Sequence, residues 1–433
     1  MAKVLFVAAE AVPFVKTGGL ADVVGSLPKE LKRQGTDIRV ILPKYGDISP
    51  VWRERMEYVK RLEITLGWRR LYCGIEKLEH EGIIYYFIDN EYYFRRQGLY
   101  GFYDDGERFS YYCRAVLEAL PYLGFTPDII HCHDWHSALV PVFLHARYRS
   151  QPPYDKLKTV LTIHNIEYQG VFDKAVLGEL LELNEDEYLT GDRLEFFGQV
   201  NYLKGGIAFA DALTTVSKTY AREILTPAGG WGLDGILRKR EADFIGILNG
   251  LDYEVYDPGQ DKYLFVNYTR RSIGRRQTNK VKLQEYLGLP VQPQTMMIAI
   301  VSRLVPAKGF DLVAAILDDI LAEDIQLVVL GTGEDKYESM FRVAAHRYNG
   351  KLSANIFFEE ALARKIYAAA DLLLMPSLQE PCGIGQLIAL RYGCVPLGRE
   401  TGGLKDTISP YNEYTGEGNG FSFAPANAPD MLY

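Results

Sequence analysis

The chain has 433 residues, of which 48% are hydrophobic and 24% are charged, ordinary values for a globular protein of two or three domains. A formal net charge of -8 provides no basic surface for nucleic acid or for an anionic membrane, so we expect neither as a partner. Five scattered cysteines without a CxxC pair, no signal-peptide pattern and no long apolar stretch favour a cytoplasmic location.

Short apolar, β-branched runs alternate with helical patterns along the whole chain. The expected strands of a first set span residues 3–8, 38–42, 83–88, 128–131, 159–164 and 213–216. Those of a second set span residues 244–248, 297–301, 326–330, 355–358, 372–375 and 395–397. Most are apolar throughout, as parallel strands covered on both faces are. This pattern predicts an α/β fold with open, doubly wound parallel sheets.

We expect two domains, residues 1–244 and 245–433, because a polar stretch follows the apolar run at 244–248. One motif, TGGLxD, occurs once in each half, at residues 17–22 and 401–406. Each copy follows an apolar run and is expected to open a helix, with its Asp in the first turn, where the helix dipole favours it. Two similar turns in two similar domains suggest two loops that face one cleft.

The first copy is preceded by Lys16, and its glycines, Gly18 and Gly19, lie between a strand and a helix. Backbone N–H groups in such a turn can approach an anion, and the helix N-terminus adds a favourable potential. The motif is neither a Walker A loop nor a GxGxxG fingerprint. An ordinary glycine turn therefore stays open as the alternative.

A second candidate is the segment SRLVPAKG, residues 302–309, directly after an expected strand. Arg303 and Lys308 would lie at the carboxyl edge of a parallel sheet, where α/β folds bind ligands. The forked guanidinium suits a diphosphate and the lysine supplies a point charge. The alternative is a solvated basic loop.

A third candidate is the segment PSLQEPCGIG, residues 376–385. Glu380 at a strand end could bind sugar hydroxyls, while Gly383 and Gly385 could offer backbone donors to a phosphate. Glu380 could equally be a capping or surface carboxylate.

A fourth candidate is HCHDWH, residues 131–136, together with His164 and Asn165 after a later strand. The His, Cys and Asp side chains raise the possibility of a metal site, but their spacing fits no standard zinc pattern. We favour a polar strand-end loop that faces a cleft, and we expect no metal. Hydride transfer is disfavoured because GTGE, residues 331–334, lacks the rest of a dinucleotide fingerprint.

Taken in order, KTGGLAD, HDWH, TIHN, ILNGLD, SRLVPAKG, EPCG and the second TGGL resemble bacterial glycogen synthases and plant starch synthases over nearly the whole chain. The resemblance implies a GT-B fold, with two Rossmann-like domains facing a central cleft, the glucan acceptor on the N-terminal side and the donor on the C-terminal side. It also implies transfer from ADP-glucose to the non-reducing end of an α-1,4-glucan, with retention of configuration and without a metal or other cofactor.

The same resemblance assigns roles to individual residues. Arg303 and Lys308 would bind the donor diphosphate and stabilise the departing ADP. Lys16 would close onto the phosphates, and Glu380 and His164 would hold the glucose. Substrate contacts are further expected from Gly18, Gly19, Asp22, Tyr100, Asp134, Asn165, Asn249, Phe358, Cys382, Gly383, Ile384, Gly385, Thr401, Gly402 and Gly403. Among these, Phe358 would stack on the adenine.

Two departures bear on the resemblance. Position 388 is Ile, where many related two-domain transferases carry a second Glu. The synthases lack that Glu too, so Ile388 favours the assignment. The family normally continues past residues 424–433 into further helices, so we expect a shortened C-terminal domain. Two other functions stay open, a retaining glycosyltransferase that uses UDP-glucose or a small acceptor, and a catalytically impaired glucan-binding paralogue. The oligomeric state does not follow from the sequence.

Overall fold

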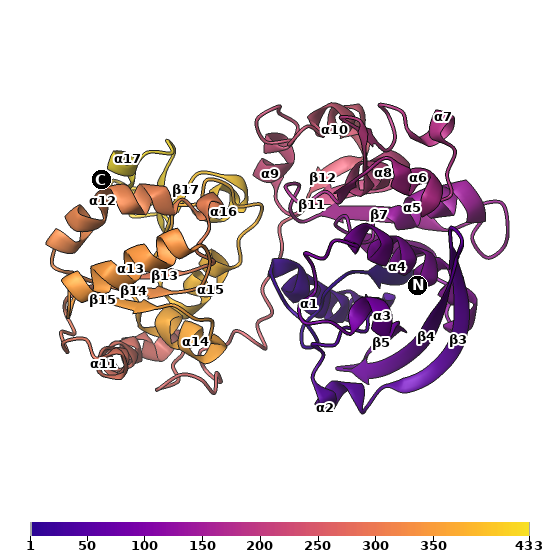
Figure 1. The fold of residues 1–433 in the computed structure, drawn as a ribbon. Helices are drawn as coiled ribbons and strands as arrows, with labels where there is room; N and C mark the ends of the chain where they lie inside the picture. The colour runs from indigo at the N-terminus through magenta and orange to yellow at the C-terminus, as the bar shows by residue number, and fades with distance from the viewer. Residues whose placement is uncertain (1, 433) are drawn as a thin grey trace. The chain divides into compact units, whose positions relative to one another are not determined.

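The computed structural model describes residues 2–432, which form two compact α/β units (Figure 1). Unit 1 runs to Val216 and includes Ala221–Gly250, whereas unit 2 comprises Ser217–Tyr220 and the chain from Leu251 onward. Both units are built around sheets of mainly parallel strands, so the predicted fold class is confirmed. No helix within residues 2–432 is long and apolar enough to cross a membrane.

Unit 1 contains a nine-stranded sheet in the order β12-β11-β7-β6-β1-β2-β5-β4-β3. Its strands are β1 (Lys3–Val7), β2 (Asp37–Pro43), β3 (Glu57–Leu66), β4 (Arg69–His80), β5 (Ile83–Asp89), β6 (Ile129–His133), β7 (Lys158–Ile163), β11 (Ala212–Thr215) and β12 (Phe244–Gly246). The strands from β12 to β5 pair in parallel, and β3, β4 and β5 form an antiparallel edge. A second, three-stranded antiparallel sheet consists of β8 (Val171–Phe172), β10 (Gln199–Asn201) and β9 (Glu195–Phe196).

The helices of unit 1 are mostly short, apart from two of 15 residues each, α1 (Gly19–Arg33) and α4 (Asp105–Ala119). The others are α2 (Pro50–Arg53), α3 (Glu91–Phe94), α5 (Leu139–Phe143), α6 (Ala175–Glu179), α7 (Glu185–Tyr188), α8 (Tyr202–Phe209) and α10 (Asp234–Lys239). Helix α9 (Lys218–Glu223) is divided between the two units, since its residues 218–220 belong to unit 2. Helix α4 is buried along almost its whole length, so it belongs to the interior of the unit and not to a solvated layer.

Unit 2 contains a six-stranded, all-parallel sheet in the order β15-β14-β13-β16-β17-β18. Its strands are β13 (Met296–Val301), β14 (Ile325–Leu330), β15 (Leu352–Asn355), β16 (Leu372–Met375), β17 (Val395–Arg399) and β18 (Phe421–Phe423). Its helices are α11 (Arg276–Leu287), α12 (Phe310–Ala322), α13 (Asp335–Arg347), α14 (Glu360–Ala369), α15 (Gly385–Tyr392), α16 (Gly402–Thr407) and α17 (Ala428–Leu432).

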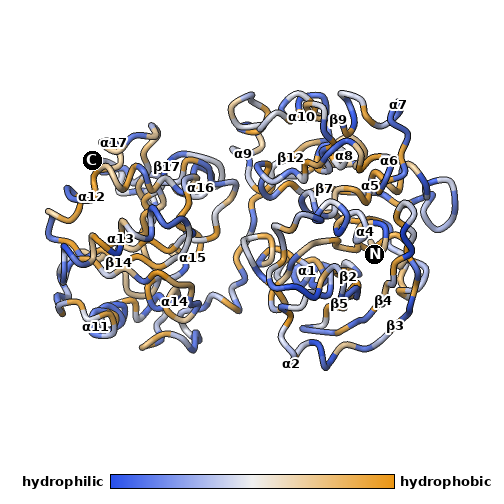
Figure 2. Tube along the Cα trace, viewed as in Figure 1, coloured by the Kyte–Doolittle hydropathy of each residue, from blue (hydrophilic) through white to orange (hydrophobic). Residues whose placement is uncertain are grey.

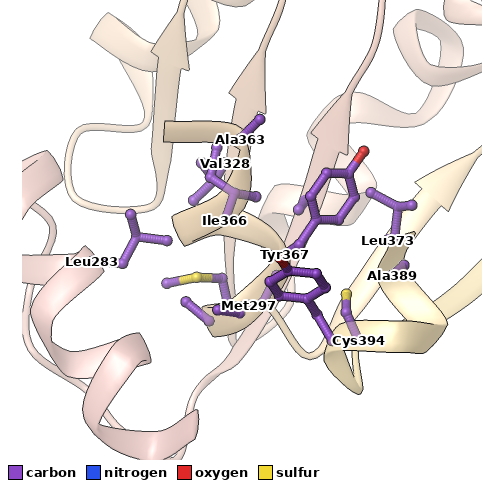
Figure 3. Packing of buried hydrophobic residues seen from close by; sticks show 14 of the residues in the cluster. Leu283, Met297, Val328, Ala363, Ile366, Tyr367, Leu373, Ala389 and Cys394 are labelled. Carbon is purple, nitrogen blue, oxygen red and sulfur yellow. The ribbon is translucent and has the colours of Figure 1, made fainter. Parts of the chain in front are cut away.

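Two apolar cores cover the two faces of the unit 2 sheet. Met297 and Val328 belong to one core, with Ile366 of α14 (Figure 3), whereas Ile300 and Val329 belong to the other, with Phe310 of α12. Successive residues of a strand point to opposite faces, which is why neighbours on one strand contribute to different cores. Figure 2 shows the result, with apolar colour along the sheet and polar colour along α11. The doubly covered sheet accounts for the apolar strands in the sequence.

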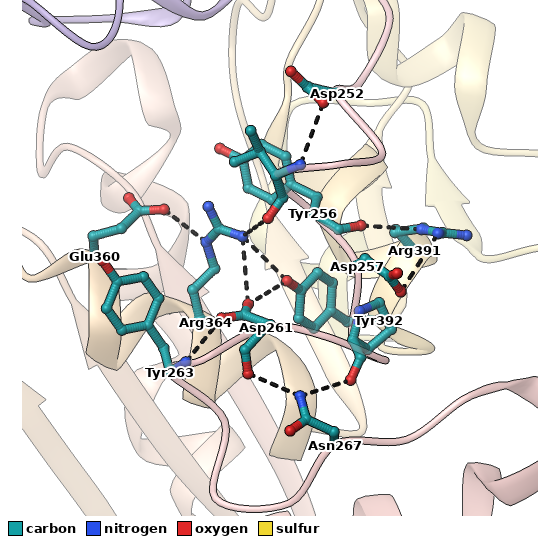
Figure 4. A network of polar contacts seen from close by, with 12 residues as sticks. Asp252, Tyr256, Asp257, Asp261, Tyr263, Asn267, Glu360, Arg364, Arg391 and Tyr392 are labelled. Atoms are coloured by element: carbon teal, nitrogen blue, oxygen red, sulfur yellow. Dashed lines mark hydrogen bonds and ion pairs between the residues drawn. The ribbon is translucent and has the colours of Figure 1, made fainter. Parts of the chain in front are cut away.

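A polar network fixes the irregular segment 251–268 onto α14 and α15 (Figure 4). The hydroxyl of Tyr392 donates to Asp261 Oδ2 at 2.5 Å and accepts from the buried Arg364 at 3.1 Å. The Arg364 guanidinium also lies 3.8 Å from the centre of the Tyr256 ring. Because α15 starts at Gly385 and ends at Tyr392, this network anchors the carboxyl end of a helix whose first residue lies in the EPCGIG segment.

The structure corrects several expectations about the strands. Residues 355–358 are not a strand, because β15 ends at Asn355, and Phe357 and Phe358 lie in the exposed loop that follows it. Strand β12, which we placed with the second set, pairs with β11 in the unit 1 sheet. The hairpin β3–β4 was not predicted, since its charged outer face gives it no continuous apolar run.

Candidate functional site

In unit 2 the second TGGL motif packs directly on the EPCG segment. Gly402 has φ +43°, and a Cβ at this position would overlap the carbonyl oxygen of Glu380. A Cβ at Gly403 would overlap the carbonyl oxygen of Cys382, and the Gly403 N–H donates to the carbonyl oxygens of Glu380 and Pro381, each at 3.1 Å. Both glycines are therefore needed for the backbone contact between the loops that follow β16 and β17.

The SRLVPAKG segment joins the same surface. Gly309 has φ +76°, and a Cβ there would overlap the carbonyl oxygen of Pro376. The N–H of Leu378 donates to the carbonyl oxygen of Ala307 at 2.8 Å. The loops after β13, β16 and β17 are thus held together at the carboxyl ends of parallel strands, the usual position of ligand sites in α/β folds.

Glu380 is the centre of this surface. Its Oε2 accepts from Lys308 Nζ at 2.5 Å and from Ser377 Oγ at 2.8 Å, and the residue is only 6% exposed. Arg303 is exposed and makes no ion pair and no side-chain hydrogen bond with any residue from 2 to 432. The site therefore pairs a buried carboxylate with one lysine and leaves a second cation available to an anion. The sequence missed Ser377, which only this hydrogen bond reveals.

Gln386 shapes the segment from Cys382 to Gly385. Its side chain is fully buried, and Nε2 donates to the carbonyl oxygens of Cys382 at 2.9 Å and Gly383 at 3.0 Å. Gly383 has φ +74°, and α15 begins two residues later, at Gly385. Ile384 is the residue before the helix. The backbone N–H groups at this helix start can bind an anion, as proposed for the motif.

The two copies of TGGLxD differ in detail. Thr401 is 3% exposed and precedes the first residue of α16, but Asp406 lies beyond the first turn, so its expected dipole role is wrong. The carboxylate of Asp406 instead accepts from Thr219, from N–H at 2.9 Å and from Oγ1 at 2.6 Å. In the first copy Asp22 does lie in the first turn of α1, where it accepts from Lys16 Nζ at 2.8 Å.

The first copy, in unit 1, is held by Glu10, which sequence reasoning missed. The buried carboxylate of Glu10 accepts from the N–H of Thr17 and, at 3.1 Å, from its Oγ1. Burial raises the pKa of Glu10. A Cβ at Gly18 would meet no heavy atom within 4 Å, so this glycine leaves open space next to the start of α1 at Gly19. Such space would let a ligand approach the backbone.

The ends of β6 and β7 bring Asp134 to His164 and Asn165. Asp134 Oδ1 accepts from the N–H of His164 at 2.7 Å and from that of Asn165 at 3.4 Å. Asp134 has φ +58°, a conformation that is uncommon outside glycine and that concentrates at functional sites. Burial raises the pKa of Asp134 to about 7 and lowers the pKa of His164 to about 3. The imidazole is therefore neutral at physiological pH.

Two of the three histidines of HCHDWH contact protein groups. His133 Nδ1 lies 3.0 Å from His164 Nε2, and His131 Nε2 lies 2.6 Å from Thr162 Oγ1. Burial lowers the pKa of His131 to about 4. Across the part of the chain that the structure describes, no group of three or more His, Cys, Asp or Glu side chains is arranged to hold a metal ion.

Tyr100 stacks near His136, with their ring centroids 4.3 Å apart. The hydroxyls of Tyr100 and Tyr45, Nδ1 of His136 and one terminal nitrogen of Arg108 are buried without a hydrogen-bond partner in the described chain. Buried polar atoms normally have partners, so this cluster has unused hydrogen-bonding capacity. The sequence indicated Tyr100, and His136 as part of the polar HCHDWH loop, but gave no signal for Tyr45 or Arg108.

Two expected site residues lie apart from these groups in the chain. Asn249 is in the connection that ends unit 1, and Phe358 is 69% exposed between β15 and α14. The expected residues of unit 2 from Arg303 to Gly403, apart from Phe358, thus lie in the loops that form one surface. In unit 1, His164, Asn165 and Asp134 lie together.

Comparison with known proteins gives the family. Residues 3–239, more than half of the chain, match the model described as starch synthase catalytic domain, and residues 289–432 match the model of glycosyl transferases group 1. The chain belongs to the glycogen and starch synthase family. It is 57% identical over 431 residues to a glycogen synthase of Desulforamulus reducens, covering 100% of this chain and 90% of the relative. It is 56% identical over 430 residues to that of Caldicellulosiruptor saccharolyticus, covering 99% and 90%.

Solved structures agree with this family. The catalytic domain of starch synthase IV from Arabidopsis thaliana, bound to ADP and acarbose, has a TM-score of 0.92 and 34% identity, covering 100% of this chain and 90% of that one. A sucrose-phosphate synthase from Thermosynechococcus elongatus, at 16% identity and a TM-score of 0.60, covering 100% and 88%, shares the fold. The chain is therefore a GT-B glycosyltransferase of the type that makes glycogen or starch.

Proposed function

We propose that this chain transfers glucose from ADP-glucose to the non-reducing end of an α-1,4-glucan with retention of configuration. The observation that carries the proposal is the surface of unit 2 on which the buried Glu380–Lys308 pair lies in one set of strand-end loops with the unpaired Arg303. That surface combines positive charge for a diphosphate with a carboxylate for sugar hydroxyls. The ADP and acarbose bound to the Arabidopsis relative support the same two ligand classes.

We assign the donor to unit 2. Arg303 binds the diphosphate, since its guanidinium is exposed and has no protein partner within residues 2–432. Lys308 forms an ion pair with Glu380. A phosphate that binds there can interact with the Lys308 ammonium group, while the Glu380 carboxylate accepts hydrogen bonds from the glucose hydroxyls. Together the two cations stabilise the charge on the departing ADP, which makes a metal unnecessary in this scheme.

The reaction is a substitution at the anomeric carbon. The bond from this carbon to the ADP oxygen breaks, a bond to the acceptor hydroxyl oxygen forms on the same face, and the acceptor proton passes to the departing phosphate. We place no carboxylate pair at the reacting carbon, so the double-displacement route of retaining glycosidases is not part of the proposal.

Unit 1 supplies the sugar-binding groups that we assign to the glucan acceptor and to the reacting glucose. His164 is neutral because burial lowers its pKa to about 3, so it acts as a hydrogen-bond partner and not as an acid. Tyr100 and His136, whose ring centroids lie 4.3 Å apart, each carry a polar atom without a partner in the described chain and so have capacity for a further hydrogen bond. Lys16, Gly18 and Gly19 are assigned to the donor phosphates, next to the open space at Gly18.

The test is ADP release from ADP-glucose, measured with and without glycogen, for the native chain and two arginine variants. We expect glycogen-dependent release, and a loss of about 10²- to 10³-fold in kcat for Arg303→Ala, as for the loss of one charge-stabilising donor. Arg271→Ala, which removes another exposed arginine of unit 2, is the matched control and should keep full activity.

Three outcomes would contradict the proposal. A higher kcat/KM with UDP-glucose would identify the other donor, which aromatic stacking on Phe358 equally allows. Release of ADP in the absence of glycogen would show that the reaction does not need a glucan acceptor. Glycogen binding without any turnover of ADP-glucose would identify the chain as a catalytically impaired, glucan-binding paralogue.

A further inference from the structure

One buried histidine of unit 1 has no role in the proposed reaction but contacts a residue that has one. His133 is the last residue of β6, and His164 directly follows β7, the neighbouring parallel strand. Nδ1 of His133 lies 3.0 Å from Nε2 of His164, which is hydrogen-bond distance. The two residues are 1% and 8% exposed, so water competes little for this hydrogen bond.

The backbone and the ring of His133 are both held by protein groups. Its N–H donates to Ser137 Oγ at 2.7 Å, and its carbonyl oxygen accepts from the same hydroxyl at 2.9 Å. Its ring stacks on that of His131, with centroids 4.3 Å apart, and lies 4.7 Å from the ring of Phe6. His133 is therefore a rigid support for whatever its Nδ1 contacts.

Packing does not explain why a histidine stands at this position. Within residues 2–432, the side chain of His133 makes one hydrogen bond, to His164, and its other ring nitrogen, Nε2, is buried without a partner. A buried polar atom without a partner costs stability, so an apolar side chain would serve a purely structural role better. The hydrogen bond to His164 is the contact that requires an imidazole.

This hydrogen bond controls the proton on His164 as well as the orientation of its ring. Both imidazoles are neutral, because burial lowers the pKa of His133 well below its usual range and that of His164 to about 3. A neutral imidazole has one nitrogen that donates and one that accepts. One proton lies between the two rings, and its position determines the tautomer of each.

The pair leaves one nitrogen of His164 for a ligand. Nε2 faces His133, and Nδ1 shares no hydrogen bond with any residue from 2 to 432. The backbone of His164 is fixed too, since its N–H donates to Asp134 Oδ1 at 2.7 Å. The ring thus offers a single nitrogen, in one tautomer, from a fixed backbone.

We infer that His133 is a positioning residue, which holds the His164 imidazole so that Nδ1 is the nitrogen that contacts the reacting glucose. This inference rests on the proposed transfer of glucose, in which His164 binds the sugar. A group that is oriented before the substrate arrives favours the reaction, and a misplacement of about 1 Å can cost about 10²-fold in rate. His133 acts through His164 and needs no contact with the substrate.

The test compares His133→Leu with His133→Asn. Leucine fills a similar space but cannot form a hydrogen bond with His164. The asparagine amide places a donor and an acceptor as far from Cα as Nδ1 is, so it can keep the hydrogen bond in either direction. His133→Leu should lower kcat about 10- to 100-fold with unchanged KM values for ADP-glucose and glycogen, whereas His133→Asn should keep most of the native kcat. Asparagine leaves a gap in the packing, so a residue that only packs would make His133→Asn the less active variant.

Thr162→Val is the matched control, since it removes a buried hydroxyl from the β7 residue paired with His133 and keeps the shape of the side chain. That hydroxyl lies 2.6 Å from His131 Nε2 and 2.6 Å from Thr214 Oγ1, and not on the pair of His133 and His164. Thr162→Val should have the native kcat. Nitrogen-15 NMR of histidine-labelled protein gives a second measurement, with the His164 signals assigned by their loss in His164→Gln. The native chain should show one tautomer of His164, and His133→Leu should show both.

The outcomes separate this inference from the proposed function. A native kcat in His133→Leu, or an equal loss of kcat in His133→Asn or in Thr162→Val, overturns the positioning role while the transferase reaction of the native chain stands. Two tautomers of His164 in the native chain overturn it as well. A native chain that transfers no glucose to glycogen refutes the proposed function, whatever the NMR spectra show.

Discussion

Replacing Gly402 by alanine should disrupt the site of unit 2 from within. Two costs add at this position, because φ is +43° and because the new Cβ would come closer than 3.0 Å to the Glu380 carbonyl oxygen. The left-handed conformation costs about 1–2 kcal/mol, and forced overlap in a packed region costs about 1–3 kcal/mol. Gly416→Ala is a matched control, since its φ is +71° but a Cβ would meet nothing within 4 Å. It should show the first cost alone.

Urea unfolding measures this difference. The extra cost of about 1–3 kcal/mol in Gly402→Ala corresponds to a midpoint about 1 M lower than that of Gly416→Ala, for a slope of about 1–3 kcal/mol per molar urea. All four tryptophans lie in unit 1, so their fluorescence should report an unchanged transition while far-UV circular dichroism reports the loss in unit 2. Gly402→Ala should also lower kcat, since the overlap displaces the backbone of Glu380. Equal midpoints and equal kcat for the two variants would refute the steric argument.

Three further predictions follow from burial and charge. Asp134→Asn should leave the free energy of unfolding unchanged at pH 4 and raise it at pH 8, because burial favours the protonated carboxyl of Asp134. The gain should grow by at most about 1.4 kcal/mol per pH unit between the unfolded pKa of 3.8 and the folded pKa of about 7. Urea midpoints across that pH range check it. The native chain should lose stability as pH falls from 6.5 to about 4, because burial lowers the pKa of His131 to about 4 and that of His164 to about 3, and unfolding lets both take up protons. These two histidines outweigh the opposite contribution of Asp134 in the same range, so a flat profile would contradict the prediction. Tyr392→Phe should cost about 1–3 kcal/mol in thermal unfolding by removing a hydroxyl that serves Asp261 and Arg364, whereas Tyr414→Phe at an exposed position should cost nothing.

Much of the scaffold could be predicted from local pattern. Eleven of the twelve expected strands coincide largely with observed ones, and the exception, 355–358, overlaps β15 only at Asn355. Continuous apolar runs are a strong signal because parallel strands are buried on both faces. The hairpin β3–β4 has an exposed charged face, and β8, β9 and β10 have only two or three residues each, so neither gives such a signal.

The candidate site was predictable where glycine and charge follow a strand. Arg303, Lys308, Glu380 and the second TGGL motif all carry that pattern, and the structure gathers them on one surface of unit 2. Glu10 and Gln386 carry no such pattern, since each is a single polar residue in an unremarkable local context. Their importance comes from partners close in the fold, the Thr17 N–H for Glu10 and two loop carbonyls for Gln386.

The sequence by itself determined the alternation of strands and helices, the strand-end positions of the charged and glycine residues, and the family. The tertiary structure alone decided that the Gly402 backbone lies against Glu380, that His164 is neutral, and that His133 contacts it. The physical reason is the range of the forces. Hydrophobic periodicity and backbone preference act between neighbours in the chain and are written in short segments. Desolvation and steric fit arise only when distant segments exclude water from one another, and no short segment contains that information.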